Sequence, residues 1–179
     1  MINDVSFGPI QQVAYIVADL DQSILMWNQA MGIGPFAVAR NVQPLEGSVY
    51  RGEESHGITI NLGFAYIDNI QLELIQPCDE QPSIYREALD AGHTALHHYG
   101  FLVEDYETAY QDALNAGYQA IVDAGQKGWA RMAYMELQSM PGLISEIIEW
   151  NDNTRPYFDG VKDMLSAADS KQLIHEFSL

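Results

Sequence analysis

Four polar residues interrupt apolar, strand-like segments and are of the types that bind divalent metal ions. They are Gln12, Glu73, His98 and Glu146. A carboxylate on an apolar strand face is costly unless it is paired, protonated or bound to a cation. One imidazole, one carboxamide oxygen and two carboxylates form a ligand set that suits Zn²⁺, Ni²⁺, Co²⁺ or Mn²⁺. Four protein ligands leave coordination positions open for a substrate, as in a catalytic site.

Each of these residues taken alone has a more ordinary explanation. Most glutamates are solvated or ion-paired, and a lone histidine is usually structural. The spacing is what favours a shared site. A shift of 86 positions relates Gln12 to His98, and a shift of 73 relates Glu73 to Glu146. Both shifts also relate longer segments of the chain, so the four residues occupy equivalent places in an internal repeat.

The repeat begins with two similar strand–helix segments, Ile10–Met31 and Leu96–Gly117. Each starts with an apolar run of strand character, passes through acidic residues that can cap a helix, and continues with helix-compatible sequence. The later segments Asn69–Gln76 and Gly142–Glu149 also match, and each follows a turn signal. The order of these pieces predicts an α+β chain that runs β-α-β-β-β twice.

Side chains alternate between the two faces of a strand. Glu73 is therefore expected to share a face with Gln71 and Ile75. By the same rule, His97 is expected to point to the face opposite His98 and to be a structural or supporting residue.

The remaining elements follow from apolar runs and from turn residues. We expect module one at about residues 8–77, module two at about 95–151, and a C-terminal helical extension at 152–179; together the modules make one domain over 8–151. The expected elements outside the repeat segments are a strand at Phe36–Val42, a polar loop or lid at Gln43–His56, hairpin strands at Ile58–Ala65 and Met132–Leu137, and helices at Ile84–Leu89, Val161–Ala168 and Gln172–Phe177.

Five segments carry a resemblance to the vicinal oxygen chelate superfamily, which includes glyoxalases, bleomycin-resistance proteins and methylmalonyl-CoA epimerase. They read VAYIVADLD at 13–21, MGIGPF at 31–36, QLELIQP at 71–77, LHHYGFLVED at 96–105 and GLISEIIE at 142–149. The resemblance covers about residues 8 to 151. It implies a glyoxalase-type fold, in which two βαβββ modules form an open β-sheet cup around a metal.

In that superfamily the metal ligands come from the first and last strands of each module, which here match Gln12, Glu73, His98 and Glu146. Many members, methylmalonyl-CoA epimerase among them, have histidine where this chain has Gln12. The zinc form of glyoxalase I is similar to this chain in having Gln, Glu, His and Glu. The resemblance implies a metal-dependent isomerase, lyase or epimerase. Its metal stabilises an enediolate, and Glu146 is the best candidate to remove a proton alpha to a carbonyl.

The substrate is expected to be a bulky apolar or aromatic small molecule. Glutathione is not expected as the carrier, because the positions that match its basic contacts are Ile16 and Thr94. The nearest match to the second carboxylate of the epimerase is Glu46. Aromatic candidates for substrate binding are Tyr15, Tyr66, Tyr99, Trp129 and Tyr134.

Two other functions stay open on the same residues. One is a metal-free small-molecule binding protein of the bleomycin-resistance type. It would have an aromatic cleft in which Glu73 and Glu146 are ion-paired or solvated. The other is an iron-dependent dioxygenase of the extradiol type, which ranks last because Gln12 replaces the first histidine of its His/His/Glu triad.

The charge balance limits the partners. The 179 residues contain 25 acidic and 8 basic side chains, a net charge of −17. Such a chain is repelled by phosphate backbones and anionic lipids, so neither nucleic acid nor a membrane surface is expected as a partner, and a CoA- or phosphate-rich substrate is disfavoured. The single cysteine, Cys78, allows no internal disulfide. No apolar run is long enough for a membrane span, and the first residues do not resemble a signal peptide. We expect a cytoplasmic protein, and a homodimer.

Overall fold

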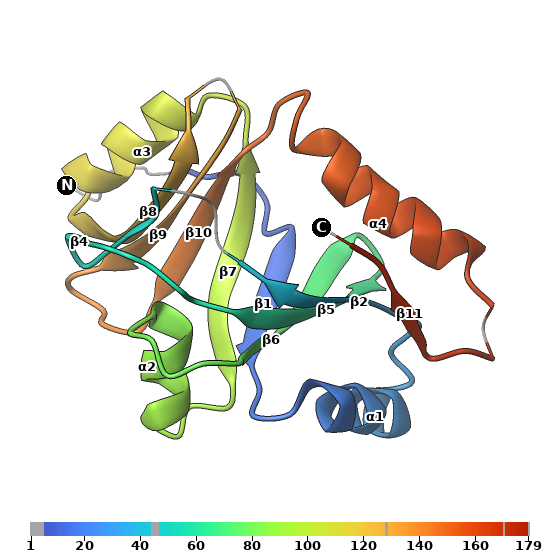
Figure 1. Ribbon diagram of the computed structural model, residues 1–179. Helices are drawn as coiled ribbons and strands as arrows, with labels where there is room; N and C mark the ends of the chain where they lie inside the picture. The colour runs from blue at the N-terminus through green and yellow to red at the C-terminus, as the bar shows by residue number, and fades with distance from the viewer. Residues whose placement is uncertain (1–5, 44–46, 128, 170, 179) are drawn as a thin grey trace.

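The computed structural model describes residues 6–43, 47–127, 129–169 and 171–178 (Figure 1). These residues form one eleven-stranded sheet with the order β11-β2-β5-β6-β1-β7-β10-β9-β8-β3-β4. The elements are β1 (Gln12–Ile16), α1 (Leu20–Met31), β2 (Phe36–Val42), β3 (Val49–Tyr50), β4 (Glu53–Glu54), β5 (Ile60–Ile67), β6 (Ile70–Pro77), α2 (Ile84–Asp90), β7 (Leu96–Val103), α3 (Tyr106–Asn115), β8 (Tyr118–Gln126), β9 (Ala130–Leu137), β10 (Ile144–Glu149), α4 (Arg155–Ala167) and β11 (Ile174–Glu176).

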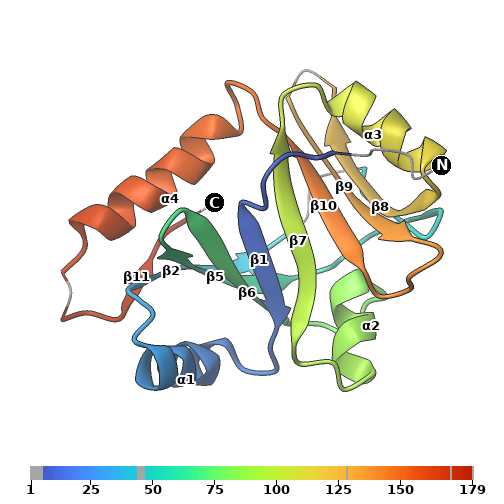
Figure 2. The same ribbon diagram turned by 180° about the vertical axis from the view of Figure 1, so that it is seen from behind.

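Two βαβββ modules make up most of this sheet, so the expected fold class is confirmed. Module one places its strands in the order β2-β5-β6-β1, and module two repeats that pattern as β8-β9-β10-β7. The modules meet at their first strands, because β1 pairs antiparallel with β7. Figure 2 shows β1 and β7 side by side at the centre of the molecule, with α1 and α3 covering the outer faces of their modules.

The two crossover helices begin where the acidic residues predict. The side chain of Asp19 accepts a hydrogen bond from the Gln22 amide at the start of α1. Asp105 accepts one from the Thr108 amide at the start of α3. Each carboxylate satisfies a free N–H group of the first turn and complements the helix dipole. The repeat therefore reproduces the helix start as well as the strands.

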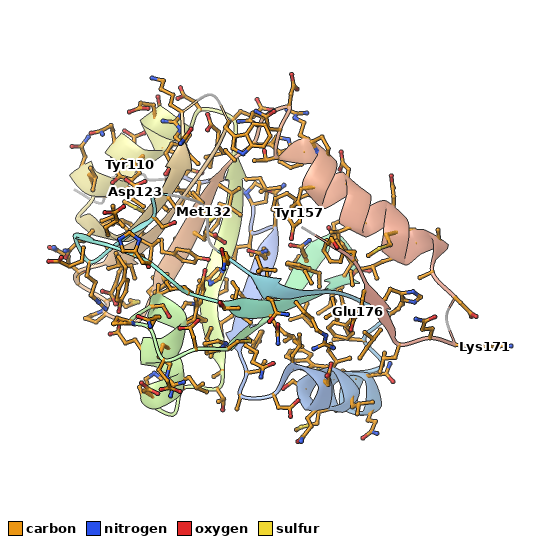
Figure 3. The ribbon with its side chains drawn as sticks, in the orientation of Figure 1. Tyr110, Asp123, Met132, Tyr157, Lys171 and Glu176 are labelled. Atoms are coloured by element: carbon orange, nitrogen blue, oxygen red, sulfur yellow. The ribbon has the colours of Figure 1, made fainter. Side chains whose placement is uncertain are left out.

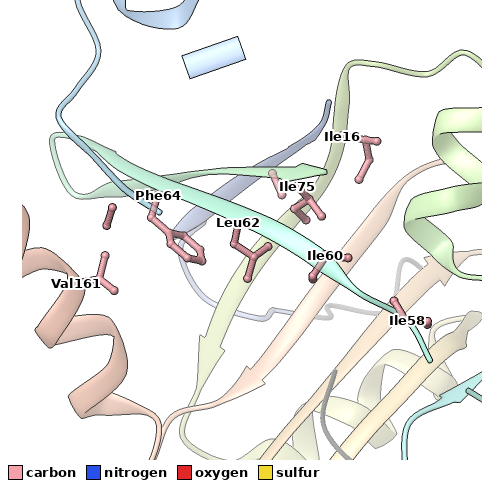
Figure 4. Close-up of a cluster of buried hydrophobic side chains, with 9 residues drawn as sticks. Ile16, Ile58, Ile60, Leu62, Phe64, Ile75 and Val161 are labelled. Atoms are coloured by element: carbon pink, nitrogen blue, oxygen red, sulfur yellow. The ribbon is translucent and has the colours of Figure 1, made fainter. Parts of the chain in front are cut away.

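The sheet of module one is buried on both faces. Alternation sends Leu72 and Leu74 of β6 toward α1. The opposite face carries Ile75 of β6 and Phe64 of β5, and Val161 of α4 packs onto it (Figure 4). This second face is the inside of the cup, and Glu73 lies on it with Gln71, as the alternating pattern predicts.

The C-terminal extension corrects one expectation. α4 is a helix, but Gln172–Phe177, which we expected to be helical, contains strand β11, and this strand runs parallel to β2 with Ile174 opposite Phe36. The physical reason is an open strand edge. β2 has unpaired backbone groups on its outer side, and a returning extended segment satisfies them. Arg40 of β2 reinforces the contact, because its Nε atom lies 2.9 Å from a carboxylate oxygen of Glu176.

The polar stretch Gln43–His56 is also more structured than a loop. In its described part, β3 and β4 form a short hairpin, and Val49 of β3 pairs with Asp123 of β8. A segment of module one thus reaches the far edge of module two. Within the described parts of the chain, no helix is both long and apolar enough to span a membrane.

Candidate metal centre

The register of four strands brings the expected ligands together at the junction of the modules. β1 pairs antiparallel with β7, while β6 and β10 run parallel to β1 and β7 on their outer sides. The result is a pair of equivalent rows across the sheet, which are Glu73–Ala14–His98 and Glu146–Gly100–Gln12.

Small residues stand at the middle of both rows. A Cβ atom on Gly100 would lie 2.7 Å from the side-chain oxygen of Gln12. The absence of a side chain at Gly100 therefore makes room for the Gln12 carboxamide, and Ala14 stands at the equivalent place beside His98. Substitution of Gly100 would push Gln12 out of its place.

Three of the candidate ligands face one another at short distance. The Nε2 atom of His98 lies 3.2 Å from Oε2 of Glu146 and 3.7 Å from Oε2 of Glu73. One ligand atom from each of the three residues lies within 4.8 Å of the others. All three side chains are buried, and Gln12 is 5% exposed.

Two ligand atoms of this cluster have no hydrogen-bond partner among the described residues. They are Oε1 of Gln12 and Nε2 of His98, and both are buried. The other end of each group is held, since Nε2 of Gln12 donates to Gln71 at 2.8 Å, and Nδ1 of His98 lies 2.9 Å from Nδ1 of His97. Leaving a buried polar atom unpaired costs free energy, which a divalent ion would recover by accepting both lone pairs. The residues therefore fit a metal.

The position of His97 differs from the expected alternation. Ala14 pairs with His98, but the next residue, Tyr15, pairs with Leu96, so β7 carries one extra residue at His97. Such a β-bulge breaks the two-residue period and re-aims a side chain. His97 thereby reaches the ring of His98 instead of the opposite face. A partner at Nδ1 fixes the ring orientation of a metal-binding histidine.

Burial and charge shape the protonation of the site. Burial, together with the charge of Glu146, raises the pKa of Glu73 well above its ordinary range. Burial, together with the proximity of His98, lowers the pKa of His97 to about 3, so this imidazole is neutral at physiological pH. Two buried carboxylates so close together are stable as anions only beside a cation.

A cavity of about 860 Å³ opens above the cluster, and Gln12, Glu73 and Glu146 line it. Its walls come from both modules and from the C-terminal extension. Met132 of β9 and Tyr157 of α4, both labelled in Figure 3, line it from different parts of the chain. Further lining residues are Ile60, Leu62, Tyr85, Trp129, Tyr134, Phe158 and Phe177.

The five aromatic candidates for substrate binding separate into two groups. Trp129 and Tyr134 line the cavity. Tyr15 instead packs against Trp27 of α1, with ring centroids 5.0 Å apart. Tyr99 pairs with Val13, which lies two residues before Tyr15 in β1, so Tyr99 is on the same outer face of the sheet as Tyr15. Their places follow from strand alternation, since each is one residue away from an inward-facing position.

Tyr66 also lies outside the cavity lining, and its hydroxyl is engaged elsewhere. It accepts a hydrogen bond from Gln71 at 3.0 Å and donates one to the carbonyl of Phe158 at 3.3 Å. Glu46, the nearest match to a second epimerase carboxylate, lies outside the described residues.

Several lining residues could not be found from the sequence. Tyr85 of α2 is one, and its hydroxyl lies 2.9 Å from that of Tyr134, which the sequence did single out. Tyr157 and Phe177 reach the cavity from the extension, where each ring packs against Phe64. No periodic pattern marks these positions, because each depends on contacts between distant segments.

Two βαβββ modules around a buried cluster of oxygen and nitrogen atoms that could hold a metal ion are the arrangement typical of vicinal oxygen chelate proteins. A family model described as "Glyoxalase/Bleomycin resistance protein/Dioxygenase superfamily" matches residues 11–134, and the chain belongs to this family. The resemblance seen in the sequence is thereby confirmed. No curated protein matches the chain.

Solved structures support the same fold at low sequence identity. The hypothetical protein BH1468 from Bacillus halodurans C-125 has a TM-score of 0.60 and 16% identity, over 80% of this chain and 95% of that one. Methylmalonyl-CoA epimerase from Mycobacterium tuberculosis has a TM-score of 0.57 and 17% identity, over 82% of this chain and 90% of that one. A variant of the Streptomyces coelicolor epimerase, in complex with 2-nitronate-propionyl-CoA, has a TM-score of 0.58 and 15% identity, over 83% of this chain and 98% of that one.

Proposed function

We propose that this protein is a metal-dependent isomerase, lyase or epimerase of the glyoxalase type, which removes a proton alpha to a carbonyl group. The observation that carries the proposal is that Oε1 of Gln12 and Nε2 of His98 are buried without a hydrogen bond among the described residues, in the same two rows as the carboxylates of Glu146 and Glu73. Family membership and the cavity above the cluster support it.

The metal would be held by Gln12, Glu73, His98 and Glu146, with zinc, nickel, cobalt and manganese all suited to these ligand types. When bound, a divalent ion supplies Lewis-acid stabilisation of negative charge on substrate oxygen atoms. The buried surroundings exclude water and strengthen every electrostatic interaction within the site.

Glu146 is the proposed base. It lines the cavity and stands opposite Tyr134 in the pairing of β10 with β9. Tyr134 and Tyr85 share one hydrogen bond between two hydroxyl groups, so one O–H proton remains to donate to a substrate oxygen. Burial, and then the charge of Glu146, raises the pKa of both phenols, which keeps that proton in place. Glu73, or Glu146 itself, would return the proton that was removed.

The proposed substrate is an apolar or aromatic small molecule rather than a CoA or glutathione conjugate. Arg40 is the only lysine or arginine among the described lining residues. Its guanidinium is already paired, 2.7 Å from Asp21 and 2.9 Å from Glu176. A polyanionic carrier would therefore find no free cation in the described lining, whereas an aromatic ring could pack against Tyr157 and Phe177.

Metal analysis of the purified protein tests the proposal. We expect about one equivalent of a tightly bound divalent ion in the wild type and much less in Glu146→Gln. Glu104→Gln is the matched control, because the Glu104 side chain is 82% exposed and lies away from the cluster. The proposal would be refuted if the wild type bound none of the four metals and Glu146→Gln bound an aromatic ligand as tightly as the wild type.

One observation favours a second function, that of a metal-free small-molecule binding protein of the bleomycin-resistance type. A protonated His98 could pair with both carboxylates, since its Nε2 atom lies within 4 Å of each. In that case Glu146→Gln would leave the binding of an aromatic ligand unchanged, and a chelator would have no effect on it.

A further inference from the structure

A row of three polar residues leads from Gln12 toward the C-terminal helix. Gln12 of β1 pairs with Gln71 of β6, and Gln71 pairs with Tyr66 of β5. Nε2 of Gln12 donates to Oε1 of Gln71 at 2.8 Å, and Nε2 of Gln71 donates to the Tyr66 hydroxyl at 3.0 Å. The hydroxyl donates in turn to the carbonyl of Phe158 in α4, at 3.3 Å.

The direction of this chain is fixed by its last member. A backbone carbonyl can only accept, so the Tyr66 proton points to Phe158 and its lone pair faces Gln71. That lone pair requires the NH₂ end of Gln71, which leaves the oxygen end of Gln71 facing Gln12. The NH₂ end of Gln12 must then face Gln71, and its oxygen faces the opposite way.

We propose that Gln71 and Tyr66 are positioning residues, which orient the carboxamide of Gln12 so that its oxygen, not its nitrogen, faces the metal centre. This inference rests on the proposed function. A carboxamide has two ends of nearly equal shape, and only the oxygen end can ligate a metal. Without a directional partner, the amide could turn and present two N–H groups to the ion.

The surroundings favour a dedicated role for Gln71. Its side chain is 1% exposed on the inner face of the sheet, where an apolar residue would be the simpler choice. The shift of 73 that relates Glu73 to Glu146 relates Gln71 to Ile144, so the equivalent place in module two is apolar. There the ligand is His98, whose ring is held by His97 instead.

The last acceptor of this hydrogen-bonded chain, the Phe158 carbonyl, lies in the C-terminal extension. Phe158 belongs to α4, and α4 is packed on module one through Val161. The extension therefore supplies the acceptor that sets the direction of the whole chain.

Zinc affinity tests this inference in Tyr66→Phe and in Gln71→Met, which has similar volume and no amide. Loss of a supporting hydrogen bond behind a metal ligand typically weakens metal binding about 10- to 100-fold. We expect about tenfold for Tyr66→Phe and a larger loss for Gln71→Met, measured by competition with a chelator. Tyr110→Phe is the matched control, because it removes an exposed hydrogen bond to Asp123. Unchanged zinc affinity in both variants would overturn the inference.

A second background separates orientation from mere packing. In Gln12→Glu both ends of the side chain are oxygen atoms, so its direction no longer matters. Tyr66→Phe added to Gln12→Glu is expected to change zinc affinity less than twofold. An equal tenfold loss in both backgrounds would show that Tyr66 acts through packing, and would overturn the inference.

A measurement without metal distinguishes this inference from the proposed function. The Gln12 NH₂ protons, observed by NMR in metal-free protein, are expected to exchange slowly in the wild type and faster in Gln71→Met. If the wild type binds no zinc but shows this difference, the proposed function fails and the oriented amide stands. If the protons exchange equally fast in both proteins, the inference fails whether or not zinc binds.

Discussion

Replacing Glu73 by glutamine is expected to stabilise the metal-free protein while it weakens metal binding. Glu73 and Glu146 each offer a carboxylate oxygen within 4.8 Å of the other. At an effective dielectric constant of about 20, two unit charges at that separation repel by roughly 3 kcal/mol. Glutamine keeps the shape of the side chain and removes one of the two charges.

The stabilisation is expected to grow with pH. Burial and the Glu146 charge raise the pKa of Glu73 above its ordinary value of 4.5, so between the two values the native state binds more protons than the unfolded state. The free energy of unfolding of the wild type therefore falls as pH rises through that window. Glu73→Gln lacks this loss, and its advantage should approach roughly 3 kcal/mol at alkaline pH. For a chain of this size that corresponds to about 6–12 °C in Tm.

Thermal unfolding in a chelator, at pH values of about 5, 7 and 9, measures the effect. Glu104→Gln again serves as the control for loss of an acidic residue. Added zinc should reverse the order, because it stabilises the wild type more than a variant that lacks one ligand. A variant less stable than the wild type at every pH in chelator, or an advantage that does not grow with pH, would refute the reasoning.

Three further outcomes are expected. Gly100→Ala should displace Gln12, because the side-chain oxygen of Gln12 lies 2.7 Å from the added Cβ. The variant should bind zinc more weakly and lose about 1–3 kcal/mol of unfolding free energy in denaturant. Wild-type values for both quantities would contradict the close packing. The His97 imidazole, with a pKa lowered to about 3 by burial, should show no NMR titration above a pH of about 5, and a midpoint near 6.5 would contradict its burial. Phe177→Ala removes an aromatic ring from the cavity wall. It should weaken the binding of benzohydroxamate, an aromatic probe, about tenfold by calorimetry but leave the zinc content unchanged. Equal affinity for the probe would exclude Phe177 as a substrate contact.

Much of the fold could be predicted because the chain repeats itself. The match of Ile10–Met31 with Leu96–Gly117 predicts two strand–helix units, and the structure confirms both. The same repeat relates the four candidate ligands, and the sheet register brings them to one place. Their role as ligands, like the homodimer and the cytoplasmic location, stays a prediction.

Local sequence rules fail at two places, where a contact between distant segments decides the structure. The alternating pattern holds for Glu73 and Gln71, but it fails at His97, where β7 carries a bulge opposite β1. The sequence of Gln172–Phe177 predicts a helix, but the segment contains strand β11 because the edge of β2 is available to it. Neither the bulge nor the free edge is visible in a single stretch of sequence.

The sequence by itself determined the two modules, the faces of most strands and the residue types of the candidate metal centre, because these follow from periodicities of two to four residues and from duplication. The tertiary structure decided how the centre is held. Only the pairing of β1, β5 and β6 joins Gln12, Gln71 and Tyr66 in one hydrogen-bonded chain, and only the return of the extension ends it at Phe158. Hydrogen bonds between distant segments depend on register and packing, which no local pattern encodes.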